Sequence, residues 1–108
     1  MNKIELAQDP NTSPEVLAEL ANGEFWSTRF LVAQHPNCTI KLLEKLATDK
    51  DWCVRCGVAE NPNCPIKILE KLATDEEFLV RYHVAQNPNC PEYIKTYLIA
   101  RKFIEEVL

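Results

Sequence analysis

Arginines recur at a fixed spacing in this sequence, and their side chains are suited to binding anions. Arg29, Arg55 and Arg81 stand 26 residues apart, with Lys3 a further 26 residues before them. A guanidinium group binds a phosphate or carboxylate through paired hydrogen bonds, so arginines in a column on one surface would suit an acidic or phosphate-bearing partner. Alternatively, aspartates and backbone carbonyls between successive units satisfy these side chains, which then hold the fold together.

A pair of cysteines has the spacing of a metal or redox site. Cys53 and Cys56 form the pattern C-x-x-C that zinc sites use. A zinc site would need two more ligands, for which the sequence offers Cys38, Cys64, His35 and His83. Positions 26 residues before and after the pair hold no zinc ligand. We therefore assign no metal and keep Cys53 and Cys56 as candidate ligands. For the evenly spaced Cys38, Cys64 and Cys90, burial as small apolar side chains is the better interpretation.

Large aromatic residues follow the same spacing. Trp26, Trp52 and Phe78 stand 26 residues apart, three residues before each arginine. Aromatic side chains on a concave surface would anchor a protein partner, since tryptophan and tyrosine dominate the energetics of protein interfaces. Alternatively, these side chains plug the junction between two layers of helices.

The elements that position these residues form an internal repeat. Residues 32–57 read VAQHPNCTIKLLEKLATDKDWCVRCG and residues 58–83 read VAENPNCPIKILEKLATDEEFLVRYH, with 16 of 26 positions identical and no gap. A period of this length is typical of proteins built from stacked structural units. The same frame places Leu6 over Val32, so the N-terminal part is a degenerate copy.

Within each unit, apolar residues indicate two short helices. Residues 40–47 have the spacing of an amphipathic helix, and residues 54–59 predict a second one. A turn with the pattern Asx-Pro-Asn or His-Pro-Asn ends each second helix, because proline cannot continue a helix. Thr12, with Glu15 three residues later, predicts the N-cap of a first helix, and Pro65 predicts the first helical position of another.

The sequence therefore predicts an all-α solenoid of about four 26-residue, two-helix repeats in a single domain, 1–108. Residues 1–31 form degenerate N-terminal repeats, 32–57 and 58–83 the central repeats, and 84–108 a C-terminal repeat with a longer capping helix. Helices this short are unstable alone and must stack on their neighbours. The predicted core consists of Val16, Leu17, Leu20, Leu42, Leu43, Leu46, Val54, Val58, Ile68, Leu69, Leu72, Val80 and Val84.

The recurring block Asn-Pro-Asn-Cys-Pro, Leu-x-x-Leu-Ala-Thr-Asp and Val-Arg-x-x-Val-Ala resembles the leucine-rich repeat variant family. The resemblance implies a right-handed superhelix in which the second helix of each unit is often 3₁₀. The sequence is more distantly similar to HEAT repeats, in which an aspartate six residues before a Val-Arg pair forms a ladder between repeats. Asp49 precedes Arg55 and Asp75 precedes Arg81 by that spacing, whereas Gly23 breaks the pattern before Arg29.

The resemblance implies a non-enzymatic scaffold that binds a protein partner. One type in the family carries an iron–sulfur cluster on a cysteine-rich segment before its repeats, and this sequence shows no such segment, so we expect no cofactor. Two other classes of function stay open: nucleic-acid binding through a concave HEAT-like face, and a metalloprotein with cysteine ligands.

Charge and composition narrow the partners. The net charge of −4 argues against nucleic acid or an anionic membrane, which need a basic face. No apolar run reaches the length of a membrane span, and five cysteines without an export signal indicate reduced thiols, so we expect a cytoplasmic protein. The family resemblance implies a bacterial-type protein. The N-terminal half-repeat leaves an apolar flank at Val16, Leu17 and Leu20 thinly covered. We therefore predict self-association or partner docking at that uncapped end.

Overall fold

The computed structural model describes residues 1–107, without the side chains of residues 103, 104, 106 and 107. Within these residues the chain has eight helices and no strand, so the all-α prediction is confirmed. The helices are α1 (Lys3–Gln8), α2 (Pro14–Leu20), α3 (Trp26–Gln34), α4 (Ile40–Leu46), α5 (Trp52–Glu60), α6 (Ile66–Leu72), α7 (Phe78–Gln86) and α8 (Glu92–Val107).

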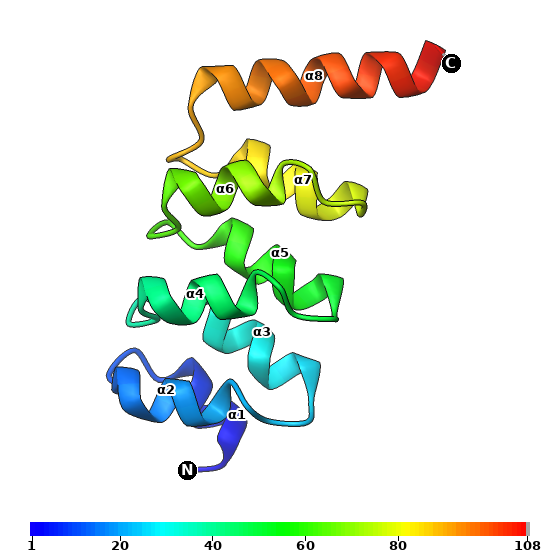
Figure 1. Ribbon diagram of the computed structural model, residues 1–108. Helices are drawn as coiled ribbons and strands as arrows, with labels where there is room; N and C mark the ends of the chain where they lie inside the picture. Colours follow the sequence, from blue (N-terminus) through cyan, green and yellow to red (C-terminus); the bar gives the residue numbers. More distant parts are fainter. Residues whose placement is uncertain (108) are drawn as a thin grey trace.

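The helices alternate between two roles along a stack of 50 × 23 × 17 Å (Figure 1). The first helices α2, α4 and α6 have 7 residues each, and the second helices α3, α5 and α7 have 9. The second helices pack directly on one another, and each also contacts the first helices before and after it. Corresponding residues of successive units therefore face the same kind of neighbour.

The second helices are α-helices, so the 3₁₀ form that the resemblance implied is wrong for this chain. The physical reason is length, because runs of 3₁₀ helix beyond three or four residues are disfavoured by their poorer hydrogen-bond geometry. Each of these helices instead continues to a turn in which His35, Asn61 or Asn87 has an extended backbone before proline.

The first helices begin one residue later than predicted. Ser13, not Thr12, caps α2, and its side-chain oxygen accepts a hydrogen bond from the backbone N–H of Val16. The buried Thr12 hydroxyl instead donates to the carbonyl of Leu6 at 2.6 Å. Pro65 likewise occupies the cap position of α6 rather than its first turn. Thr12 shares its column with three buried cysteines, so this column points into the core and cannot cap a helix.

The hydrophobic core follows the predicted positions. All thirteen are buried except Val16, which is half-buried and packs against the core. The column of Cys38, Cys64 and Cys90 is buried as well, which confirms its interpretation as small apolar side chains. The first helices and the second helices, whose valines follow the pattern Val-x-x-x-Val, thus each have an apolar face, and these faces pack against each other.

The N-terminal end is covered better than the sequence suggested. Leu17 and Leu20 are buried, and α1 packs against both α2 and α3. A capping box formed by the exposed residues Asn2 and Glu5 stabilises the first turn of α1. The self-association predicted at this end stays a prediction. At the other end, the apolar residues Phe103, Ile104 and Val107 of the predicted capping helix have side chains outside the described part of the chain.

None of the helices in the described part of the chain is long and apolar enough to cross a membrane.

Candidate functional site

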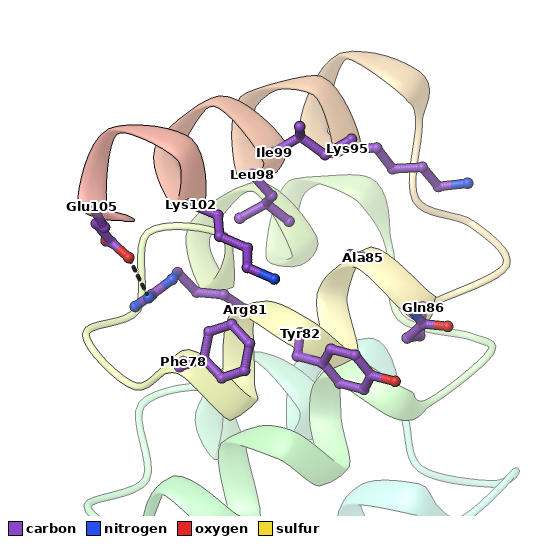
Figure 2. A pocket seen from close by; sticks show the side chains of 10 residues that line it. All are labelled: Phe78, Arg81, Tyr82, Ala85, Gln86, Lys95, Leu98, Ile99, Lys102 and Glu105. Carbon is purple, nitrogen blue, oxygen red and sulfur yellow. Dashed lines mark hydrogen bonds and ion pairs between the residues drawn. The ribbon is translucent and has the colours of Figure 1, made fainter. Parts of the chain in front are cut away.

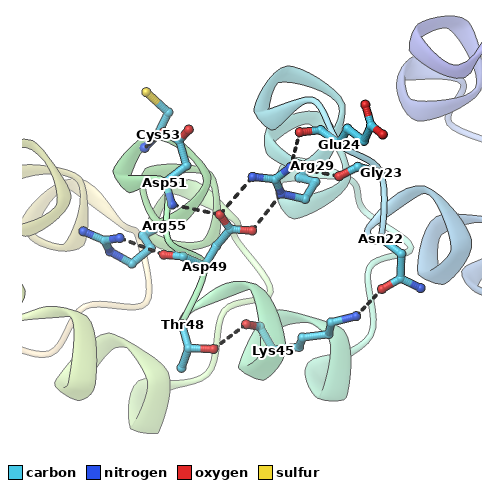
Figure 3. Close-up of polar contacts among 10 residues, drawn as sticks. All are labelled: Asn22, Gly23, Glu24, Arg29, Lys45, Thr48, Asp49, Asp51, Cys53 and Arg55. Carbon is cyan, nitrogen blue, oxygen red and sulfur yellow. Dashed lines mark hydrogen bonds and ion pairs between the residues drawn. The ribbon is translucent and has the colours of Figure 1, made fainter.

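The three arginines project from the second helices toward the following unit. The Nε and one terminal nitrogen of Arg29 donate to the two carboxylate oxygens of Asp49, at 2.8 and 3.2 Å (Figure 3). Arg55 makes the same paired contact with Asp75, at 2.7 and 3.2 Å. Each arginine also donates backward, and Arg55 bonds the backbone carbonyl of Asp49 at 2.7 Å. We call these repeated contacts the arginine ladder.

The ladder runs between repeats through aspartates and backbone carbonyls, as the structural interpretation predicted. Arg29 and Arg55 each bind the aspartate side chain 20 residues after them and the backbone carbonyl six residues before them. Gly23 therefore does not interrupt the ladder, because Arg29 needs only the carbonyl oxygens of Gly23 and Glu24, both at 2.9 Å. The expectation that the ladder is interrupted at Arg29, because Gly23 replaces the aspartate, is therefore wrong.

The ion pair between Arg29 and Asp49 changes the protonation of both groups. The hydrogen bond that Arg29 donates to the Asp49 carboxylate raises the pKa of Arg29 above its ordinary value. Burial acts to raise the pKa of Asp49, but the hydrogen bond from Arg29 and the backbone N–H of Asp51 together bring it below its ordinary value. Both groups are therefore charged at neutral pH and form an ion pair with each other.

A second ladder runs through the turns, and sequence reasoning missed it. The side-chain amide of Asn61 donates to the carbonyls of Ala33 and His35 in the preceding unit, at 2.8 and 3.2 Å. Asn87 repeats this contact one unit later, and both side chains are almost completely buried. His35 donates from Nε2 to the carbonyl of Asp9 while its Nδ1 accepts from the backbone N–H of Asn37. We call these contacts the turn ladder.

The signal for the turn ladder is present in the sequence. His35, Asn61 and Asn87 can each donate a hydrogen bond, whereas the first copy has Asp9, whose carboxylate cannot. In the described chain no unit precedes Asp9, and its carboxylate accepts from the backbone N–H of Asn11. The turn pattern predicts the bonds that these side chains accept from their own turn, but not the bonds that they donate to the preceding unit.

The aromatic residues Trp26, Trp52 and Phe78 are the first residues of α3, α5 and α7. We call them the aromatic row. Their side chains are 47 %, 38 % and 50 % exposed, so they do not plug the junction between the helix layers. Trp26 packs edge-on against Phe30, with 6.3 Å between ring centroids. The structure thus places the sequence-predicted Trp26 and Trp52 on an accessible edge.

Cys53 and Cys56 lie in α5, Cys53 half-buried and Cys56 buried. Burial raises the pKa of both thiols, that of Cys56 to about 12, and Asp51 adds to the effect on Cys53. A zinc ligand must be a thiolate, so both shifts act against metal binding. Among the described residues no three Cys, His, Asp or Glu side chains gather in a metal-binding arrangement. Ligation by these two cysteines stays an untested prediction.

Comparison with known proteins now decides the family. The model described as leucine-rich repeat variant domain matches residues 2–55, and the model described as leucine-rich repeat variant matches residues 52–77. The chain belongs to the leucine-rich repeat variant family. No curated protein and no solved structure matches the chain significantly. The family is one of structural repeats, which agrees with the stacked helices of this chain.

In this leucine-rich repeat variant chain, the predicted binding residues divide into two groups. Arg29 and Arg81 are buried, and the guanidinium of Arg55 is held on both sides by the ladder. The arginines therefore connect successive units of the stack. Their binding of an anionic partner or nucleic acid stays an untested prediction. Trp26 and Trp52 expose apolar surface that nothing in the described chain covers.

Proposed function

We propose that this leucine-rich repeat variant chain is a protein-binding scaffold without catalytic activity of its own, and that the aromatic row is part of its binding surface. The observation that carries the proposal is the half-exposure of Trp26, Trp52 and Phe78 on one edge of three stacked helices. Exposed apolar side chains that gather on one part of a protein surface mark interaction sites more often than scattered single ones do.

The row suits a binding site because the scaffold holds it in place. Each aromatic residue begins a helix whose arginine, three positions later, is fixed by the arginine ladder. A partner would therefore meet helices that are already ordered, which lowers the entropic cost of binding. Aromatic side chains bury a large area, and their truncation in interface centres costs about 2 kcal/mol or more each.

The test compares two pairs of exposed apolar residues, each with a spacing of 26 residues. Trp26→Ala with Trp52→Ala removes two members of the aromatic row, and Ile40→Ala with Ile66→Ala removes the exposed first residues of α4 and α6. A partner is identified by capture from an extract of the source cells, and its dissociation constant is then measured for both double variants by calorimetry.

We expect the tryptophan pair to weaken binding by at least about 30-fold and the isoleucine pair by less than about threefold. Equal affinity of both double variants for the partner would contradict the role of the aromatic row. Urea unfolding of both variants serves as the control, since all four side chains are exposed and their loss should leave the fold intact.

The finer architecture belongs to the same proposal. We infer a unit of 26 residues and a right-handed sense of the superhelix, as the family resemblance implies, with a cytoplasmic location. The equal offsets between the starts of α3, α5 and α7 support the unit length. A crystal structure, from which the rotation between successive units is measured, tests the handedness.

A further inference from the structure

A groove of about 460 Å³ lies between α7 and α8 at the C-terminal end of the stack (Figure 2). One wall comes from α7 and the other from residues 95–105 of α8. Phe78 and Tyr82 line it from α7, and Leu98 and Ile99 line it from α8, so its lining is largely apolar (Figure 2). Both Tyr82 and Ile99 are strongly exposed, at 46 % and 71 %.

The wall formed by α7 is the face on which a further second helix would stack. A Cβ added at Gly57 of α5 would lie 3.0 Å from Ala33 and 3.1 Å from the ring of Phe30 in α3, so these two columns face the following helix. In α5 the same columns are Cys56 and Ala59, at 4 % and 0 % exposure. In α7 they are Tyr82 and Ala85, and within residues 1–107 no further second helix covers them.

The other wall exists because α8 does not turn back. The first helices α4 and α6 end after 7 residues, but α8 continues for 16 and so runs past α7. Lys95 of α8 stands where α2, α4 and α6 have leucines that are completely buried. A lysine borders the groove where a repeat in the interior of the stack has a core residue.

The charges at the groove favour an acidic occupant. Lys95 and Lys102 both border it, and Arg81 reaches it from α7. The arginine ladder would give Arg81 an aspartate from the next unit, but position 101 is arginine, and Arg81 instead contacts Glu105 at 3.4 Å. Glu105 is exposed and also pairs with Arg101. A carboxylate from a bound chain would complete the rung that Glu105 fills with poorer geometry.

A second copy of this chain fits the groove poorly. Its own α1 would have to take the place of a second helix, with Asp9 in the column of Asn61 and Asn87. Asn87 donates two hydrogen bonds to carbonyls of the preceding unit, whereas a carboxylate would meet carbonyl oxygens there without a donor. Two grooves placed face to face would bring Lys95 and Lys102 of both copies together, which like-charge repulsion disfavours.

We propose that the groove between α7 and α8 binds an acidic amphipathic helix of a partner protein, which packs on α7 as the next second helix of the stack and offers a carboxylate to Arg81. The proposal rests on the proposed function, a protein-binding scaffold, and adds a second surface and the chemistry of its ligand. The apolar face of the helix covers Tyr82 and Ile99, and its acidic residues face Lys95 and Lys102, as in other helix-in-groove complexes.

The probe is a fluorescent peptide with the sequence of residues 75–89, the segment that packs on α5 in the intact chain and begins with Asp75, Glu76 and Glu77. The matched control peptide has Asn and Gln at these three positions. Fluorescence anisotropy with the full chain measures both. We expect the acidic peptide to bind saturably, with a dissociation constant below about 1 mM, because a short helix that folds on binding loses affinity to the cost of ordering. The control peptide should bind at least about tenfold more weakly.

Two variants of the chain make the result specific to the groove. Tyr82→Asp should abolish peptide binding, and Lys95→Glu with Lys102→Glu should remove the preference for the acidic peptide. Tyr93→Asp, an exposed tyrosine of α8 outside the groove, should bind as the original chain does. No saturable binding of the acidic peptide, or equal binding of both peptides, would overturn the proposal.

Two further measurements separate this proposal from its alternatives. Sedimentation showing self-association of the chain that Tyr82→Asp abolishes would assign the groove to a second copy and overturn the proposal. The pair Trp26→Ala with Trp52→Ala should leave peptide binding unchanged. If this pair of substitutions abolishes partner binding and the peptide does not bind, the groove proposal is refuted and the scaffold proposal is supported. If the pair leaves partner binding unchanged and the peptide binds, only the role of the aromatic row is refuted.

Discussion

Arg55 in α5 and Arg81 in α7 hold the same place in their helices but meet different surroundings. Arg55 is paired through two hydrogen bonds with Asp75, which is almost completely buried and is also held by the backbone N–H of Glu77. Arg81 contacts Glu105 through one hydrogen bond of 3.4 Å, and the side chain of Glu105 is 47 % exposed. The interior of the stack therefore has ion pairs preorganised by the next unit, and its C-terminal end has a replaceable one.

The comparison teaches that a residue in a repeat protein takes its role from its neighbour rather than from its own unit. Stability of such proteins is the sum of the units and the interfaces between them. Equivalent substitutions should then cost much in the interior of the stack and little at its ends. Three pairs of substitutions test that difference, from the largest expected effect to the smallest, and a fourth experiment tests one interior rung by itself.

The largest contrast lies in the turn ladder. Asn61→Asp should destabilise the fold by about 4 kcal/mol, because a buried carboxylate would replace the amide that donates to the carbonyls of Ala33 and His35. Asp9→Asn, the same column at the N-terminal end, should change the free energy of unfolding by less than about 0.5 kcal/mol. Urea unfolding monitored by circular dichroism measures both, and similar costs would contradict the comparison.

The arginine ladder offers the next contrast. Asp75→Ala should cost about 3 kcal/mol, since it leaves the largely buried guanidinium of Arg55 without its carboxylate. Glu105→Ala should cost at most about 1 kcal/mol, because Glu105 is itself half exposed and contacts Arg81 through a single hydrogen bond of 3.4 Å. The measurement is the midpoint of urea unfolding with the slope of the transition held fixed. A costly Glu105→Ala would show that the end rung is as firmly held as the interior ones.

Close packing of the second helices is the third test. Gly57→Ala should cost about 1 kcal/mol net, because its Cβ would lie 3.0 Å from both the Cβ of Ala33 and the carbonyl oxygen of Phe30. The strain exceeds the roughly 1 kcal/mol that alanine contributes as a better helix former. The equivalent His83→Ala in α7 should change stability by less than about 0.5 kcal/mol. A stabilised Gly57→Ala would mean that α3 and α5 can move apart freely.

The smallest effect is the pH dependence of one rung. The folded-state pKa of Asp49 lies below its unfolded value near 3.8, so the folded state binds fewer protons in that range. The stability that the ionised carboxylate contributes is therefore complete above that value and is lost as the pH falls through the folded-state pKa. The difference in unfolding free energy between the original chain and Asp49→Asn should shrink as the pH falls from 7 to 3.

A background variant checks the cause of that pH dependence. In Arg29→Met the carboxylate of Asp49 has no guanidinium partner, so the effect of Asp49→Asn should depend less on pH. An unchanged pH dependence in this background would assign it to another group.

Sequence periodicity predicted the architecture well because it reports which residues are equivalent. The recurrence of Val-Arg-x-x-Val-Ala located the second helices, and the leucines of residues 40–47 located the first. It predicted the cap of α2 one residue too early, since a column of threonine and cysteines carries no sign of which way it points. The aromatic row was found, but periodicity left open whether its side chains are exposed or buried between the helix layers.

Contacts between units were harder to predict from sequence. Arg29 binds an aspartate 20 residues ahead, and Asn61 binds carbonyls 26 and 28 residues behind. A pattern within one unit cannot show these distances, because they depend on how far apart and at what angle neighbouring units stack. The groove between α7 and α8 was missed for the same reason, although Lys95 in a column of leucines was a usable signal.

By itself the sequence determined that this protein consists of paired short helices, each apolar on one side and too short to be stable alone, because the spacing of apolar residues and prolines is set along the chain. Only the tertiary structure decided the partner of each polar side chain. Stacking places Arg55 between two aspartates, buries Asn61 against the previous turn and leaves Tyr82 uncovered, because these outcomes depend on the presence of a neighbouring unit in space.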